Sequence, residues 1–169
     1  MRLPDSRVEK FILAAILTGM ALALSLIDSA ISSLIPILPG FKIGLANIVS
    51  IFALYYLGLS YSLMICVARS LLAGIFSGNL TMILFSLAGG IASIIVMFLL
   101  MRRISQIKVS VTGGIVHNMM QVAVAVLVTS TPQVVYYLPV LIAAGAVSGF
   151  FMGLLCRLVF VRLKLETVS

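Results

Sequence analysis

Long blocks of apolar residues alternate with short polar stretches along the whole chain. Each block is apolar on every face that a helix would present, and none shows the every-second-residue alternation of a transmembrane β-strand. A helix of about 20 such residues crosses a hydrocarbon core of about 30 Å. Because only helices and closed barrels span a bilayer, the pattern predicts an all-α, polytopic membrane protein, a single domain over residues 1–169 built as a compact bundle of six transmembrane helices. We expect the helices at about residues 8–28, 42–58, 60–76, 80–101, 109–129 and 134–161.

Composition and charge support this prediction and orient the bundle. Apolar residues make up 63% of the chain and charged residues 9%, against roughly 25% charged in soluble domains. The basic residues cluster before the first helix, between the fourth and fifth, and after the sixth, which by the positive-inside rule predicts a multi-pass protein of the cell membrane with both termini cytoplasmic. The net charge of +7 therefore serves topology and indicates no nucleic-acid partner. Two basic residues, Lys42 and Arg69, fall outside these clusters.

Lys42 lies in the first turn of the predicted second helix, after the turn signal Pro39-Gly40. The N-terminus of a helix already carries a partial positive charge, so a lysine there is unfavourable unless an anion lies near it. Asp28, at the end of the first predicted helix, is one candidate for that anion, and a bound ligand is the other. Asn47 follows in the same helix as a further polar residue.

Arg69 lies near the middle of the predicted third helix, roughly 13 Å from its start at about 1.5 Å per residue. A charged side chain at that depth costs about 2.5–3.5 kcal/mol on insertion scales, so it should face the protein interior or a cavity. A structural arginine bonded to helix-end carbonyls and a ligand-binding arginine both fit this position.

The predicted fifth helix has one polar side. Gly114, Asn118 and Gln121 follow i, i+4, i+7 spacing, and His117 pairs with Gln121 at i+4. Lipid disfavours such a side, so we expect it to pack inward, either in hydrogen bonds between helices or as the lining of a ligand cavity. His117 is the only histidine and has no acidic or cysteine neighbours, so we expect no metal site.

Small residues recur at four-residue spacing in two helices, as Ala15, Gly19 and Ala23 in the first and as Gly145, Gly149 and Gly153 in the sixth. Such stripes let helices approach closely, either within the chain or with a partner.

The sequence contains none of the residue patterns that we associate with an enzyme. It has no carboxylate pair, no Gly-rich phosphate loop with a lysine, and no metal-type spacing of Cys66 or Cys156. Its four acidic residues are too scattered to hold magnesium against a diphosphate, as prenyl transfer requires. We therefore expect a protein that is not an enzyme, has no cofactor and contains no ATPase of its own.

Several motifs resemble one protein family over nearly the whole chain. They are PGFKIGLAN at 39–47, Arg69 in the third helix, SGN at 77–79 and GGIVHN at 113–118. Together with six helices and a long first outer loop, they resemble the Gx transporter family, which is also labelled heptaprenyl diphosphate synthase component I. That family is similar, mainly in architecture, to the substrate-binding S components of energy-coupling factor (ECF) vitamin transporters.

The resemblance implies a bundle that binds a small vitamin-like solute near its outer face, with the first outer loop as a lid. It also implies partners: a transmembrane scaffold subunit with two ATPases would dock on Ala15, Gly19 and Ala23, where a glycine replaces the family's middle alanine. The polar residues of the bundle could converge on the solute site, and the two cations among them favour an anionic or strongly polar ligand. These candidate ligand-binding residues are Lys42, Asn47, Arg69, Asn79, His117, Asn118 and Gln121.

Three functions remain open at this point. The first is a substrate-binding subunit of an ATP-driven importer. The second is a solitary carrier driven by an ion gradient, which the shortage of membrane carboxylates and the lack of a detectable inverted repeat disfavour. The third is a non-catalytic membrane subunit of heptaprenyl diphosphate synthase, which would co-purify with a soluble, aspartate-rich enzyme.

Overall fold

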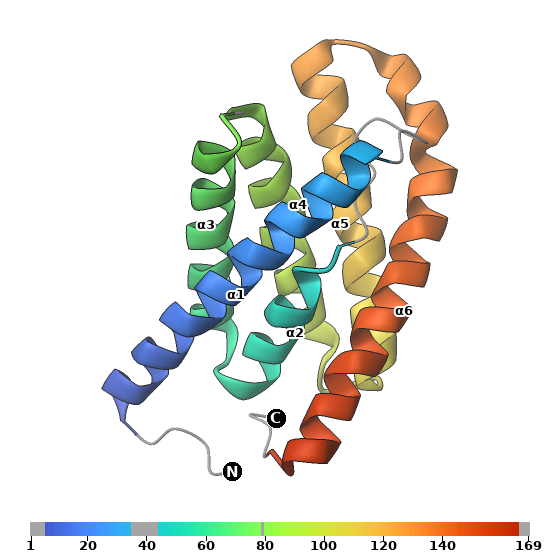
Figure 1. Cartoon of the computed structure of the whole chain (residues 1–169). Coiled ribbons are helices and arrows are strands. Elements are labelled where there is room, and N and C mark those ends of the chain that lie inside the picture. Colours follow the sequence, from blue (N-terminus) through green and yellow to red (C-terminus); the bar gives the residue numbers. More distant parts are fainter. Residues whose placement is uncertain (1–5, 35–43, 79, 166–169) are drawn as a thin grey trace.

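The computed structural model describes residues 6–34, 44–78 and 80–165. Over these residues the chain is helical and without strands, which confirms the predicted all-α bundle (Figure 1). The elements are α1 (Arg7–Leu34), α2 (Asn47–Tyr56), α3 (Leu59–Phe76), α4 (Leu80–Leu100), α5 (Gln106–Thr129), the 3₁₀ helix η1 (Pro132–Tyr137) and α6 (Leu138–Leu163). Five of the helices are long and apolar enough to cross a bilayer, so the chain is a multi-pass membrane protein.

The second helix is shorter than the sequence suggested. We expected residues 42–58 to form a spanning helix, but α2 has 10 residues and begins at Asn47, which makes it about 15 Å long. The cause lies at Gly44, whose φ of +79° belongs to the left-handed region and interrupts a right-handed helix. Residues 44–46 instead form tight turns, with the N–H of Asn47 donating to the Gly44 carbonyl at 2.9 Å. α2 therefore starts inside the bundle.

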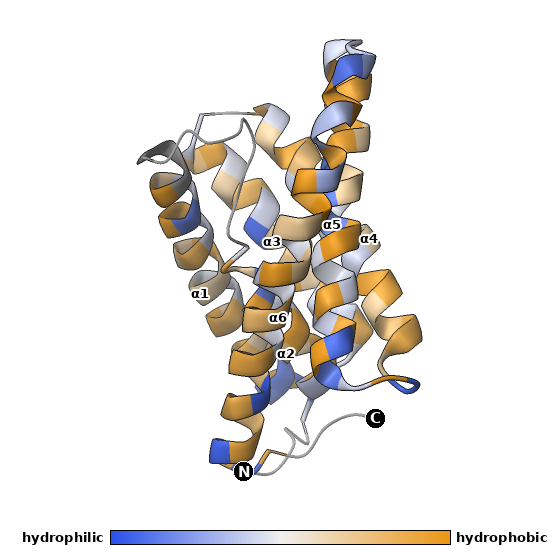
Figure 2. Ribbon diagram, turned by 90° about the vertical axis from the view of Figure 1, so that its right-hand side faces the viewer, coloured by the Kyte–Doolittle hydropathy of each residue, from blue (hydrophilic) through white to orange (hydrophobic). Residues whose placement is uncertain are grey.

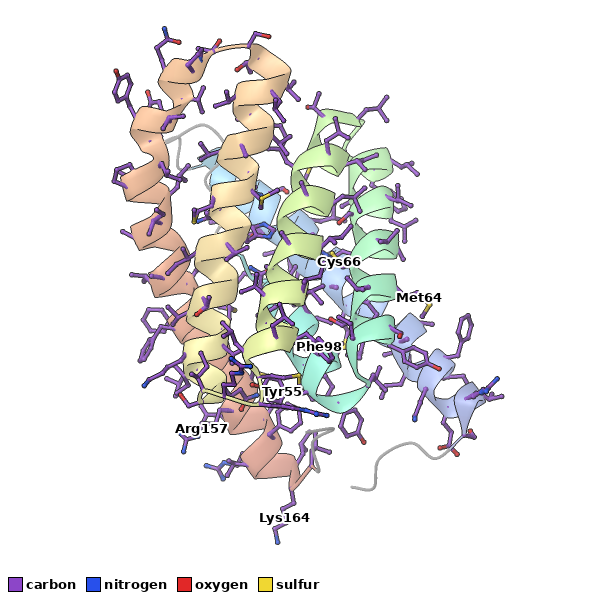
Figure 3. The ribbon with its side chains drawn as sticks, turned by 180° about the vertical axis from the view of Figure 1, so that it is seen from behind. Tyr55, Met64, Cys66, Phe98, Arg157 and Lys164 are labelled. Carbon is purple, nitrogen blue, oxygen red and sulfur yellow. The ribbon has the colours of Figure 1, made fainter. Side chains whose placement is uncertain are left out.

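Chain direction alternates from helix to helix. In Figure 1, α1, α3 and α5 run toward one end of the bundle, and α2, α4 and α6 run back. The start of α1, the α4–α5 connection and the end of α6 therefore share one end, which we call the basic end. Arg157 and Lys164 project there in Figure 3. The other described basic residues of this end are Arg7, Lys10, Arg102, Arg103, Lys108 and Arg162.

α2 fills the interior of the bundle toward its basic end. It contacts α1, α3, α4 and α6, and seven of its ten residues are buried. Aromatic rings close the packing, with the Phe52 and Phe160 centroids 5.2 Å apart and the Phe52 and Tyr56 centroids 5.4 Å apart. Figure 2 shows apolar positions along most of the helix lengths and hydrophilic positions near the ends and at a few interior points. The apolar core thus occupies one half of the bundle and leaves space beyond the N-terminus of α2.

The two small-residue stripes differ in their surroundings. The α6 stripe lies against α5, because a Cβ on Gly149 would stand 2.6 Å from the Ser110 carbonyl oxygen and one on Gly145 would stand 2.6 Å from the Gly114 carbonyl oxygen. The α1 stripe faces outward: Ala15, Gly19 and Ala23 are exposed, and a Cβ on Gly19 would meet nothing within 4 Å. The α6 glycines therefore serve packing within the chain, and the α1 stripe is open to an outside partner.

Candidate ligand site

A polar cavity lies where α2 begins, and all six α-helices or their adjoining turns contribute to it. Such a concentration of hydroxyl, amide and charged groups is unusual inside a membrane bundle. The lining residues are Ser25, Asp28, Gly44, Ala46, Asn47, Arg69, Ala73, Met82, Ser86, Gly114, His117, Asn118, Gln121 and Ser148.

Five of the seven candidate ligand-binding residues meet at this cavity. They come from three different helices and are Asn47, Arg69, His117, Asn118 and Gln121. The other two, Lys42 and Asn79, lie outside the residues that the structure describes. The expected convergence is therefore seen for the described candidates, and their binding of a ligand stays a prediction.

Arg69 is the most unusual side chain of the site. It is 6% exposed, and its Nη1 donates to the Ser25 hydroxyl oxygen at 2.9 Å. Among the described residues, its Nε and Nη2 have no hydrogen-bond partner. Within the described ranges, the unsatisfied nitrogens receive no helix-end carbonyl. A buried cation with two unsatisfied donors is costly.

Asp28 binds the turn that precedes α2. Its carboxylate is 3% exposed and accepts a hydrogen bond from the Gly44 backbone N–H at 2.8 Å. This contact ties α1 to the turn before α2 and fixes the left-handed conformation of Gly44. The possible pairing of Asp28 with Lys42 lies outside the described residues.

The polar side of α5 combines the two uses considered from the sequence. The Asn118 amide donates to the Leu141 carbonyl oxygen at 2.6 Å, which links α5 to α6. Gln121 Nε2 and His117 Nε2 lie 3.1 Å apart in a pair within α5. All three side chains also line the cavity. The hydrogen bonds therefore hold in place side chains that also form the cavity wall.

Two glycines of α4 make room for side chains of the neighbouring helices. A Cβ on Gly89 would stand 2.9 Å from His117 Nδ1. A Cβ on Gly90 would collide with Cys66 Sγ, whereas its 3.7 Å distance from Arg69 Nη2 is an ordinary contact. The missing side chains therefore make room for His117 on α5 and for Cys66 on α3.

The N-terminus of α2 adds a positive potential to the site. Gly44, Ala46 and Asn47 line the cavity, so the first turn of the helix points its positive dipole end there, equivalent to roughly half an elementary charge. Interrupted helices that begin inside a membrane bundle form anion sites in this way in several transporters.

The cavity is small in this conformation. The space open to the centre of a water-sized sphere is about 20 Å³, and one water molecule needs roughly 10–15 Å³ by this measure. A molecule larger than water can enter only if the surrounding helices or turns separate.

Several lining residues were not among the candidates predicted from the sequence, among them Ser25, Gly44, Ser86 and Ser148. Ser25 had a usable signal, since it lies three residues before Asp28 and so on the same side of the helix. The others are single small residues in apolar surroundings, and serine commonly bonds to its own helix there. Nothing in their spacing separated them from ordinary helix positions.

Comparison with known families supports the resemblance found in the sequence. The family model described as "Heptaprenyl diphosphate synthase component I" matches residues 17–159, which include every residue that lines the cavity. The searches of curated proteins and of solved structures gave no match.

Proposed function

Because the chain belongs to the heptaprenyl diphosphate synthase component I family, also named the Gx transporter family, we propose that it is a membrane-embedded substrate-binding subunit of a solute importer. It captures a small polar or anionic, vitamin-like solute in the cavity at the start of α2. Like an ECF S component, it depends on a transmembrane scaffold and ATPase subunits for energy. The chain itself performs no chemistry.

Arg69 is the observation that carries this proposal. A buried guanidinium whose Nε and Nη2 lack partners in the described part of the chain is explained if a ligand oxygen completes its hydrogen bonds. The site combines it with the positive end of α2 and with the polar side of α5. A purely structural bundle has no need for this combination at a cavity.

A solitary ion-coupled carrier fits less well. Proton or sodium coupling generally requires ionisable groups within the membrane that can change partners. Asp28 is the one acidic residue within the described membrane region, apart from Glu9 at the beginning of α1. Its carboxylate is occupied by the Gly44 N–H, which suits a structural role.

The exposed stripe of Ala15, Gly19 and Ala23 is the proposed docking site for the scaffold subunit. In the described chain, Gly19 has no packing partner that would explain a glycine, and glycine inside a helix costs about 1 kcal/mol relative to alanine. A closely packed helix of another subunit accounts for it. Because of the positive-inside rule, the basic end faces the cytoplasm of the cell, with both chain termini on that side.

Native mass spectrometry of the protein purified gently from its own host tests the proposal. We expect a retained small molecule and co-purifying ATPase subunits. Arg69→Ala should abolish retention of the small molecule while the protein remains monodisperse, because the variant removes the binding group and leaves the helix packing intact. Loss of the folded bundle would instead identify Arg69 as a structural residue.

The name of the family favours a second function, a non-catalytic membrane subunit of a prenyl diphosphate synthase. The same purification distinguishes this second function from the importer. A protein without small molecule or ATPases, bound stably to a soluble prenyl synthase, would replace the importer proposal.

A further inference from the structure

We infer that the cavity recognises its solute through a single carboxylate group, held side-on by Nε and Nη2 of Arg69. This inference rests on the proposed solute-binding function and names the class of solute. It follows from the geometry of the guanidinium, from the charges around it and from the uncharged groups in the rest of the cavity.

One nitrogen of the Arg69 guanidinium is hydrogen-bonded within the protein, and the other two are left for a ligand. Ser25 accepts from Nη1 at 2.9 Å, and the same hydroxyl donates to the Ala21 carbonyl oxygen at 2.8 Å. The serine is thus oriented by its own helix and in turn orients the arginine. Nε and Nη2, which lack partners among the described residues, carry parallel N–H bonds on one edge of the planar group. That edge matches two oxygens of one carboxylate or phosphate.

The surrounding charge selects between these two anions. Arg69 is the one cation among the described residues that line the cavity, and Asp28 is the one anion. Their formal charges cancel, and the N-terminus of α2 adds roughly half a positive charge. On the described lining these charges sum to about +0.5, so a carboxylate of charge −1 leaves about −0.5. A phosphate monoester at about −1.5 to −2, or a diphosphate, would leave about −1 or a more negative charge on the same lining, in a low-dielectric interior.

The remaining lining favours uncharged polar groups on the rest of the solute. Ser86, Ser148, Asn118 and Gln121 offer hydroxyl and amide groups, and Met82 offers apolar surface. The solute class is therefore a monocarboxylic acid with neutral hydrogen-bonding groups. Its entry must widen the cavity, which has room for about one water molecule.

The experiment uses the full-length protein in lipid nanodiscs and two measurements. The first identifies, by mass spectrometry, any compound released from protein purified from the native host. The second measures how much each added compound raises the melting temperature. Each carboxylate is compared with its amide, as acetate with acetamide, benzoate with benzamide and octanoate with octanamide. Inorganic phosphate and isopentenyl diphosphate are tested as the competing anions. We expect a released compound with one carboxylate, and stabilisation by carboxylates that their amides and the phosphates do not reproduce.

Three variants connect the effect to Arg69. Arg69→Gln should weaken binding of the best carboxylate roughly 100-fold or more, since two charge-assisted hydrogen bonds are lost. Arg69→Lys keeps the charge but lacks the planar edge, so it should weaken binding of the same carboxylate about 10-fold. Ser25→Ala keeps the edge and loses its orientation, so it should weaken binding by less than Arg69→Gln does. Melting temperature and size-exclusion profile without ligand report folding, and the lysine variant serves if the glutamine variant fails to fold.

Several results would overturn the inference. They are a released phosphate ester or neutral compound, equal stabilisation by an amide and its carboxylate, unchanged affinity in Arg69→Lys, or no released compound together with no stabilisation by any carboxylate. Failure of the importer proposal looks different. Carboxylate binding through Arg69 without any co-purifying ATPase would refute the importer and leave the carboxylate site intact.

Discussion

Arg69 is the charged group among the buried polar side chains that lack hydrogen bonds in the described part of the chain, where the hydroxyls of Tyr55 and Ser70 also lack a partner. Other buried serines bond to backbone carbonyls, as Ser93 does to Gly90 at 2.9 Å and Ser62 to Ser50 at 3.0 Å. A hydroxyl has one proton to donate and needs one such acceptor, whereas a guanidinium has five N–H protons to donate. The described surroundings of Arg69 provide one bond. At the residue scale, this shortfall is the observation on which the proposed ligand site depends.

The contact between Gly90 and Cys66 is a close side-chain contact near the site. Gly90→Ala should destabilise the protein by about 1–3 kcal/mol through overpacking, because its new methyl group would collide with Cys66 Sγ. Adding Cys66→Ala removes the sulfur and should recover most of the loss. Thermal unfolding of the two single variants and the double variant in detergent measures this coupling. Strictly additive effects would mean that the sulfur is not what the methyl group meets.

At the scale of elements, α5 and α6 are held together by backbone approaching backbone. Gly149→Ala should cost about 1–3 kcal/mol, since the Ser110 carbonyl oxygen belongs to a helix and cannot turn away as a side chain does. The matched control is Gly19→Ala on the exposed side of α1, where the methyl group meets nothing. That variant should stabilise the isolated bundle by about 0.5–1 kcal/mol. Denaturant titrations of both variants should move in opposite directions, and a shared loss of stability would contradict this account.

The presence of the long helices was predictable because bilayer thickness fixes their approximate length, but some of their ends were not. The expected end of the first helix at residue 28 was wrong, since α1 continues to Leu34, and the sixth helix begins at Leu138, after the 3₁₀ helix η1, and not at 134. The boundaries of α3 and α4 differ from expectation by one residue. The start of α2 was not predictable in this way. Gly44 could have continued a helix, and its left-handed conformation depends on a hydrogen bond to Asp28, sixteen positions earlier. Likewise, the polar side of α5 was visible as spacing, but the link between Ser25 and Arg69 joins two helices and left no periodic signal.

At the scale of the whole molecule, the orientation in the membrane follows from the basic end. Gln133→Cys lies in η1 at the opposite end, and Ser105→Cys lies at the basic end before α5; both positions are exposed. Cys66 and Cys156 are 0% exposed, so the reagent should label only the introduced thiol. A membrane-impermeant maleimide should label Gln133→Cys on intact cells and Ser105→Cys only after lysis. The reverse pattern would place both termini outside.

The half-length of α2 has a consequence for the membrane that holds this protein. The polar cavity stops where α2 begins, and from there to the basic end the interior is filled by a helix with seven of ten residues buried and by the packed, tilted rings of Phe52 and Phe160. An ion on that route would have to shed its water in an apolar medium, which is prohibitive. The filled half of the bundle therefore blocks the passage of ions, whatever the cavity binds. A cell can therefore hold many copies in its membrane without dissipating the ion gradients that drive its other transporters.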